Sequence, residues 1–154
     1  MKQSPLMTRA LTACAALALS AASTGLALAA DFGSPAEAKA MLEKAIKAVQ
    51  TDEKAALTAF SKGEAGFKDR DLYPFCGGPD GNFTAHPSLV GKSMKDLKDK
   101  AGEPLGAKFY SVAKEGEVSE VAYQWPRPGS DAPVAKVSFV TKVGQQICAV
   151  GYYK

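Results

Sequence analysis

The 154-residue chain contains little of the chemistry that enzymes and metalloproteins use. It has one histidine, three cysteines and one tryptophan. Cys-x-x-Cys and Cys-x-x-Cys-His motifs are absent, which argues against a thioredoxin-like site and c-type haem attachment. The Gly-x-Ser-x-Gly motif of hydrolases is also absent, as are the glycine-rich motifs that bind phosphate groups and dinucleotides. We therefore expect no catalytic residues, no cofactor and no metal site.

The chain also lacks a strong excess of charge of one sign. It carries 19 Lys and Arg residues against 16 Asp and Glu residues. Two of the cations, Lys2 and Arg9, precede an N-terminal apolar run, and without them the balance is 17 to 16. A chain with no basic stripe is not expected to bind nucleic acid.

The apolar run lies over Ala10–Ala22 and is followed by the small-residue end Ala27-Leu28-Ala29. This order predicts a secretory signal peptide over residues 1–29, cleaved at that end. Its alanine-rich composition, and the absence of a basic cluster after it, argue against a membrane anchor. We therefore expect one mature domain over residues 31–154, periplasmic or secreted and without a membrane span.

Two of the cysteines, Cys76 and Cys148, belong to that mature domain. An oxidising compartment lets a disulfide persist, so this pair is expected to be bonded. The bond would close a loop of about 70 residues and stabilise the fold by at most roughly 4 kcal/mol in the chain-entropy model. The alternative is a pair of buried free thiols.

Helical periodicity dominates the first part of the mature chain. Ser34-Pro35-Ala36-Glu37 has the form of a capping box, and apolar residues then recur every three or four positions. Thr51 and Asp52 could break or re-cap this helix before the pattern resumes over residues 55–60. Gly63 is expected to end it.

Strand patterns dominate the rest of the chain. Residues 71–87 resemble a hairpin turned at Gly77–Asn82, and a second helix is expected over Pro104–Lys114. Three further strands follow: one from Glu117 that includes Trp125, then Val134–Lys142 and Gln145–Tyr153. This order predicts an α+β fold, with a long N-terminal helix packed on a five-stranded antiparallel sheet. If the first and last strands are central neighbours, the two cysteines come within bonding distance.

Several short sequence motifs follow one another along the mature chain: Asp71-Leu72-Tyr73-Pro74-Phe75, Ala85-His86-Pro87, Leu89-Val90-Gly91-Lys92, Trp125-Pro126, Lys142-Val143-Gly144 and Gly151-Tyr152-Tyr153. The ordered set resembles the single Cache domain, a PAS-like extracytoplasmic sensor module. The resemblance implies the Cache fold and a small-molecule pocket between the sheet and the loops on its face, often for short carboxylates. It also implies a signalling partner, such as a membrane-bound sensor kinase or chemoreceptor. No second membrane helix follows, so we expect a stand-alone exported form.

Three candidate ligand contacts are aromatic or imidazole side chains. His86 ends a strand and can donate to a ligand oxygen. Tyr123 and Trp125 share one strand face and offer apolar walls with polar tips. The alternatives are a structural hydrogen-bonding role for His86 and a purely core role for the other two.

Three more candidates carry charge or a hydroxyl group. Arg127 could pair with a ligand carboxylate, and Lys136 could supply a second positive charge. Tyr73 could turn its hydroxyl group toward the ligand. The alternatives are a solvated Arg127, an edge-strand Lys136 and a core Tyr73.

These features predict an exported, non-catalytic domain that binds a small organic ligand. The principal alternative is an interaction module that docks on a membrane-bound kinase or transporter and has no ligand of its own. An exported hydrolase using His86 as its base is a third possibility, which would require a nucleophile held against that imidazole.

Overall fold

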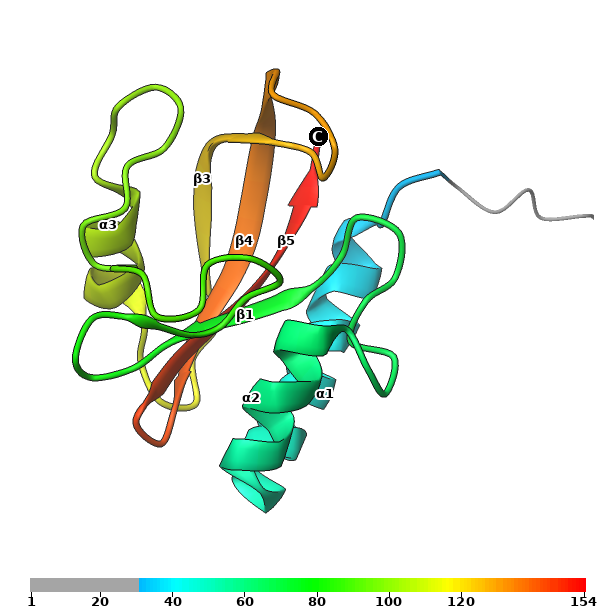
Figure 1. The fold of residues 1–154 in the computed structure, drawn as a ribbon, viewed down its shortest axis with the longest axis vertical. Coiled ribbons are helices and arrows are strands. Elements are labelled where there is room, and N and C mark those ends of the chain that lie inside the picture. Colours follow the sequence, from blue (N-terminus) through cyan, green and yellow to red (C-terminus); the bar gives the residue numbers. More distant parts are fainter. Residues whose placement is uncertain (1–30) are drawn as a thin grey trace, which may run out of the picture.

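The computed structural model describes residues 31–154 (Figure 1). The predicted signal peptide, residues 1–29, lies outside the described residues. Three helices and five strands follow in this order: α1 (Pro35–Thr51), α2 (Glu53–Lys62), β1 (Pro74–Gly77), β2 (Phe83–Ala85), α3 (Leu105–Val112), β3 (Ser119–Pro126), β4 (Pro133–Val143) and β5 (Gln146–Tyr153). Within residues 31–154, no helix is long and apolar enough to cross a membrane.

The predicted capping box is present at the start of α1. Ser34 Oγ accepts from the Glu37 amide at 3.3 Å, and Glu37 Oε2 accepts from the Ser34 amide at 2.7 Å. Asp52 ends this helix and caps α2, accepting from the Ala55 amide at 3.0 Å. The N-terminal helical region is therefore two helices, because Asp52 re-caps the chain.

The sheet confirms the predicted topology. Its strand order is β2-β1-β5-β4-β3, and neighbouring strands are antiparallel. The last strand, β5, is central and buried on both faces, as its apolar run indicates. Cys76 of β1 lies opposite Cys148 of β5, and the two form the expected disulfide.

The sheet separates two hydrophobic clusters, because successive side chains on a strand point to opposite faces. Helices α1 and α2 cover one face, whose cluster includes Leu42, Phe60 and both cysteines. The other cluster includes Phe75 and Phe109 and lies on the side of α3 (Figure 1). The predicted site residues Tyr73, Tyr123 and Trp125 belong to this second cluster.

The second predicted helix is shorter than expected. It covers Leu105–Val112 and not Pro104–Lys114. The Lys114 carbonyl instead accepts from the Lys142 amide at 3.2 Å and from Thr141 Oγ1 at 3.2 Å. The chain leaves the helix at this point because its backbone bonds to the end of β4.

Candidate functional site

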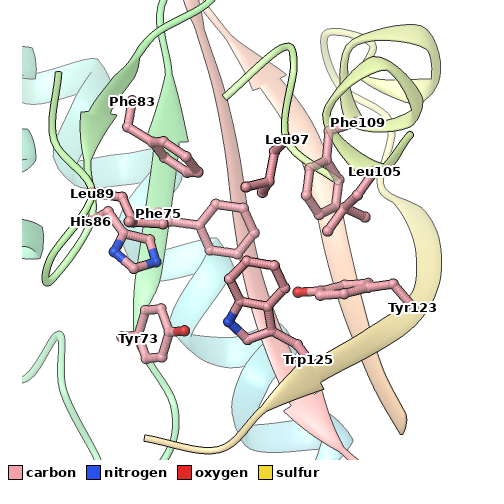
Figure 2. Close-up of a pocket in the computed structure, with 10 residues that line it drawn as sticks. All are labelled: Tyr73, Phe75, Phe83, His86, Leu89, Leu97, Leu105, Phe109, Tyr123 and Trp125. Atoms are coloured by element: carbon pink, nitrogen blue, oxygen red, sulfur yellow. The ribbon is translucent and has the colours of Figure 1, made fainter. Parts of the chain in front are cut away.

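An aromatic pocket lies on the α3 side of the sheet. Figure 2 shows its ten lining residues, contributed by the residue before β1, by β1, β2, β3 and α3, and by the loops that follow β2: Tyr73, Phe75, Phe83, His86, Leu89, Leu97, Leu105, Phe109, Tyr123 and Trp125. The space within it that a water molecule can occupy is about 20 Å³, enough for about one water. We call this space the inner pocket.

A wider cavity of about 250 Å³, which we call the vestibule, adjoins the inner pocket. The two share Tyr73, His86, Leu89 and Trp125. The other vestibule residues are mainly cationic or proline: Lys68, Arg70, Pro87, Ser88, Pro126, Arg127 and Pro128. An apolar inner pocket therefore opens into a space with basic side chains at its wall.

His86 lies immediately after β2, where the two cavities meet. Its Nδ1 accepts from the Ser88 amide at 3.0 Å, so the neutral imidazole carries its proton on Nε2. Burial, and then the positive charge of Lys136, lower the pKa of His86 to about 4. The ring is packed edge-on against Tyr73 and Phe83, with centroids 5.5 and 5.2 Å away. His86 is therefore a neutral N–H donor at neutral pH.

Lys136 lies in the floor beneath the pocket, with only 2% of its surface exposed. It is on the inner strand β4, so the edge-strand alternative is wrong. Its Nζ donates to the hydroxyls of Tyr73 at 3.3 Å and Tyr153 at 3.4 Å, and lies 4.6 and 4.5 Å from their ring centres. Burial lowers the Lys136 pKa to about 7, opposed by the negative charge of Asp71.

The side chain of Lys136 reaches Tyr73 by crossing β5 at a glycine. A Cβ atom at Gly151 would lie 2.5 Å from Lys136 Cε and 2.5 Å from Ser138 Oγ. The absence of a side chain at position 151 therefore makes room for the lysine.

Arg127 is paired within the protein. Its Nη1 donates to Asp71 Oδ2 at 2.8 Å, and the guanidinium lies over the rings of Phe32 and Tyr153. The Asp71 side chain is 7% exposed and that of Arg127 is 22% exposed. The solvated alternative for Arg127 is therefore wrong, although the side chain still reaches the vestibule.

Three hydrogen-bond donors meet near the junction of the two cavities. Lys136 donates to Tyr73, which leaves the Tyr73 hydroxyl hydrogen available. Within residues 31–154, neither this hydrogen, nor His86 Nε2–H, nor the indole N–H of Trp125 has an acceptor. Figure 2 shows the polar tips of these three side chains directed toward a common space. Such a cluster suits a ligand that accepts hydrogen bonds.

The charged groups around this space do not cancel. Lys136 and Arg127 are cationic, and Asp71 is the carboxylate that pairs with Arg127. When Lys136 is protonated, these three residues carry one excess positive charge. The surroundings therefore favour an anionic ligand over a neutral one.

The predicted site residues divide into four groups. Tyr73, His86 and Trp125 line both cavities, and Tyr123 lines the inner pocket, where its hydroxyl lies 2.8 Å from Ser138 Oγ. Arg127 lines the vestibule alone. Lys136 lines neither and contacts the site through Tyr73.

Sequence reasoning missed Asp71 and most of the apolar wall. Asp71 begins the predicted hairpin and is not among the predicted site residues. Its position two residues before Tyr73, a predicted ligand contact, is the sequence signal that could have identified it. The missed wall residues are Phe75, Phe83, Leu89, Leu97, Leu105 and Phe109.

The described residues offer little for catalysis or metal binding. No group of three or more His, Cys, Asp or Glu side chains suited to a metal occurs among residues 31–154. The candidate nucleophile beside His86 is Ser88, whose Oγ lies 3.5 Å from His86 Nδ1. That nitrogen already accepts from the Ser88 amide, so the arrangement is a local turn contact.

The fold is an α+β arrangement of the PAS-like type, with an aromatic pocket on one face of its sheet. A family model described as the Cache domain matches residues 38–153, and the chain belongs to this family. The predicted family resemblance is therefore confirmed.

Several known proteins with similar sequences or structures are chemotaxis proteins. The methyl-accepting chemotaxis protein McpP of Pseudomonas putida is 30% identical over 56 residues, which are 36% of this chain and 10% of that protein. A methyl-accepting chemotaxis protein of Vibrio parahaemolyticus has a TM-score of 0.62 at 23% identity, covering 77% of this chain and 86% of that one. The match to McpP therefore covers about a tenth of the length of that protein.

Two further solved structures share the fold. A periplasmic sensor domain of a chemotaxis protein has a TM-score of 0.58 at 26% identity, over 75% of this chain and 87% of that one. A Cache chemosensory domain solved in a study of carboxylic acid recognition has a TM-score of 0.53 at 21% identity, over 75% and 85%.

Proposed function

We propose that this chain is an exported, non-catalytic sensor-type domain that binds a short carboxylate. The observation that carries the proposal is the convergence of the Tyr73, His86 and Trp125 donors beside Lys136, whose protonated form gives the site one excess positive charge. A carboxylate accepts hydrogen bonds through both oxygens and carries the complementary charge. The aromatic inner pocket would receive its short apolar end.

The size of the site limits the ligand. The vestibule, at about 250 Å³, lies just below the usual range of about 300–1,000 Å³ for small-molecule sites. The inner pocket admits little more than a water molecule until its side chains move. A carboxylate with a few carbon atoms fits these dimensions better than a sugar or a peptide.

The proposed setting is the periplasm, and the proposed partner is a membrane-bound chemoreceptor or sensor kinase. The similarity to sensor domains of chemotaxis proteins supports both. The ligand class is also supported by the Cache domain that was studied for carboxylic acid recognition.

The test is a thermal-shift and calorimetry screen of the oxidised mature protein with matched ligand pairs. Acetate, propionate, pyruvate and lactate would each be compared with the corresponding neutral amide. Binding at a hundredfold excess over the dissociation constant stabilises the native state by about 2.7 kcal/mol. We expect carboxylates to raise the melting temperature and amides to have much less effect.

Variants of the pocket complete the test. His86→Ala and Trp125→Ala should weaken carboxylate binding tenfold or more, because each loses about 1.5 kcal/mol or more of contacts with a charged group. Ser111→Ala, on the exposed side of α3, is the control. Unchanged affinity in both pocket variants would refute the site. A folded wild type that binds nothing in the screen would favour the partner-docking alternative.

A further inference from the structure

Arg127 connects the vestibule to two distant parts of the chain. Its guanidinium is 3.8 Å from the ring centre of Phe32, just before α1, and 4.5 Å from that of Tyr153, at the end of β5. Its Nη1 also donates to Asp71. A vestibule residue therefore contacts both the approach to the first helix and the end of the last strand.

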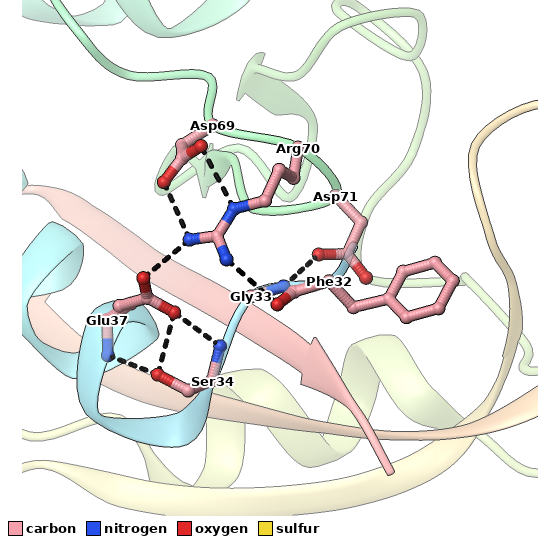
Figure 3. Close-up of polar contacts among 7 residues, drawn as sticks. All are labelled: Phe32, Gly33, Ser34, Glu37, Asp69, Arg70 and Asp71. Carbon is pink, nitrogen blue, oxygen red and sulfur yellow. Dashed lines mark hydrogen bonds and ion pairs between the residues drawn. The ribbon is translucent and has the colours of Figure 1, made fainter. Parts of the chain in front are cut away.

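Asp71 completes this connection. Its Oδ1 accepts from the Gly33 amide at 2.7 Å (Figure 3), while its Oδ2 accepts from Arg127 at 2.8 Å. We call the four residues Phe32, Gly33, Asp71 and Arg127 the N-terminal clasp. The clasp holds the backbone before α1 against the wall of the proposed ligand site.

Neighbouring contacts reinforce the clasp. Arg70 donates to the Phe32 carbonyl at 2.9 Å and to Glu37 Oε1 at 2.6 Å, and Glu37 belongs to the capping box of α1 (Figure 3). The two residues on either side of Arg70 take part as well, since Asp69 also accepts from it and Asp71 binds Gly33. A shift at the clasp would therefore reach the first turn of α1.

Resting on the proposed function, we infer that an anion bound in the vestibule tightens the N-terminal clasp and so transmits occupancy to the start of α1. The opposite coupling would require the ligand to withdraw Arg127 from Asp71. Breaking that pair would leave the buried carboxylate without its cation, a cost equal to roughly a thousandfold in affinity. A small carboxylate makes too few contacts to offset such a loss.

Tightening needs no broken bond. A guanidinium has several N–H donors, and Arg127 uses one of them on Asp71. Within residues 31–154, the others have no acceptor. An anion that accepts from these remaining donors would bind the guanidinium at N–H groups that Asp71 does not use. It would restrict the motion of the guanidinium against the rings of Phe32 and Tyr153.

The direct measurement is amide hydrogen exchange at Gly33, read by NMR with and without saturating propionate. Sodium chloride at equal ionic strength is the control for screening. We expect propionate to slow Gly33 exchange several-fold, because exchange requires the Asp71–Gly33 bond to open. Unchanged or faster exchange in the bound protein would overturn the inference.

Thermodynamic linkage supplies the second measurement. If occupancy tightens the clasp, loss of a clasp residue outside the cavities must weaken binding. Phe32 lines neither cavity and is 50% exposed, so Phe32→Ala should fold normally and weaken propionate binding about threefold. Val118→Ala is the matched control, since Val118 is 44% exposed and also lines neither cavity.

The two proposals fail in different ways. If wild type binds propionate but Phe32→Ala has unchanged affinity, the clasp is not coupled to the site and the proposed function stands. If wild type does not bind propionate, the inference fails together with this form of the proposed function.

Discussion

At the scale of single residues, Lys136 is a group whose charge state depends on the fold. Its ammonium contacts the rings and hydroxyls of Tyr73 and Tyr153, and the charges of Asp71 and Arg127 affect its pKa. Burial disfavours the charged form, and one buried carboxylate shared with Arg127 does not fully compensate. The Lys136 pKa therefore falls to about 7 from an ordinary value of 10.5.

This shift predicts how stability varies with pH. Between pH 7 and pH 9.5 the unfolded chain keeps the Lys136 proton and the folded chain releases it, so the free energy of unfolding rises with pH. Lys136→Met removes this contribution. We expect the stability of wild type, relative to the variant, to increase by about 2 to 3 kcal/mol over this range in urea denaturation. Parallel pH profiles for the two proteins would contradict the assignment.

His86 predicts a loss of stability in acid. Its pKa is about 4 in the folded protein against 6.5 as the ordinary value, so the unfolded chain takes up the proton first as the pH falls. From pH 7 to pH 4.5, wild type should lose about 2 kcal/mol more than His86→Asn. Asparagine can still accept from the Ser88 amide, and carboxylate protonation is common to both proteins. An equal loss in both would show that the imidazole is not kept neutral by burial.

At the scale of elements, α3 depends on a backbone-to-backbone contact. A Cβ at Gly106 would lie 1.8 Å from the Met94 carbonyl oxygen, and the Gly106 amide donates to the Leu97 carbonyl at 2.9 Å. Gly106→Ala must push α3 away from this turn. Because Leu105 and Phe109 of α3 line the inner pocket, the displacement would also disturb the ligand site.

We expect Gly106→Ala to lower the free energy of unfolding by more than about 2 kcal/mol, measured by denaturant titration. Gly116→Ala is the matched control. Its Cβ would meet nothing within 4 Å, and only its φ of 75° is unfavourable, so a loss of about 1 kcal/mol is expected. Equal losses in the two variants would mean that the Gly106 contact is not tight.

The difference between local and long-range contacts explains which parts of the fold the sequence could predict. The capping box at Ser34, the re-capping at Asp52 and the strand periods are local signals, and each has its expected structure. The central position of β5 followed from its two apolar faces together with the two cysteines. The helix after Pro104 was placed too long because its end depends on contacts with β4, far along the chain.

The candidate site was less predictable, because its roles depend on which strands become neighbours. The sequence predicts His86 at the end of a strand and Trp125 on one strand face with Tyr123. Lys136 could not be placed inside, because strand periodicity does not say whether a strand is at an edge. The pairing of Asp71 with Arg127 joins residues 56 positions apart, and no local pattern encodes it.

At the scale of the whole molecule, the sheet separates the disulfide from the proposed ligand site. Cys76 and Cys148 lie in the cluster covered by α1 and α2, whereas Tyr73, Phe75 and Trp125 belong to the cluster on the opposite face. The disulfide joins β1 to β5 across 72 residues of sequence. It can therefore stabilise the whole domain without contacting the inner pocket.

This separation predicts the result of removing the disulfide. Cys76→Ala with Cys148→Ala should lower the free energy of unfolding by about 2 to 4 kcal/mol, because the unfolded chain regains the entropy of the closed loop. Propionate affinity, measured by calorimetry where the variant is fully folded, should stay within about twofold, since the bonded side chains point away from the pocket. Wild type treated with reductant provides an independent version of the same change. A large loss of affinity in a folded variant would instead mean that the β1–β5 link sets the position of Tyr73, and that the two faces of the sheet are mechanically coupled.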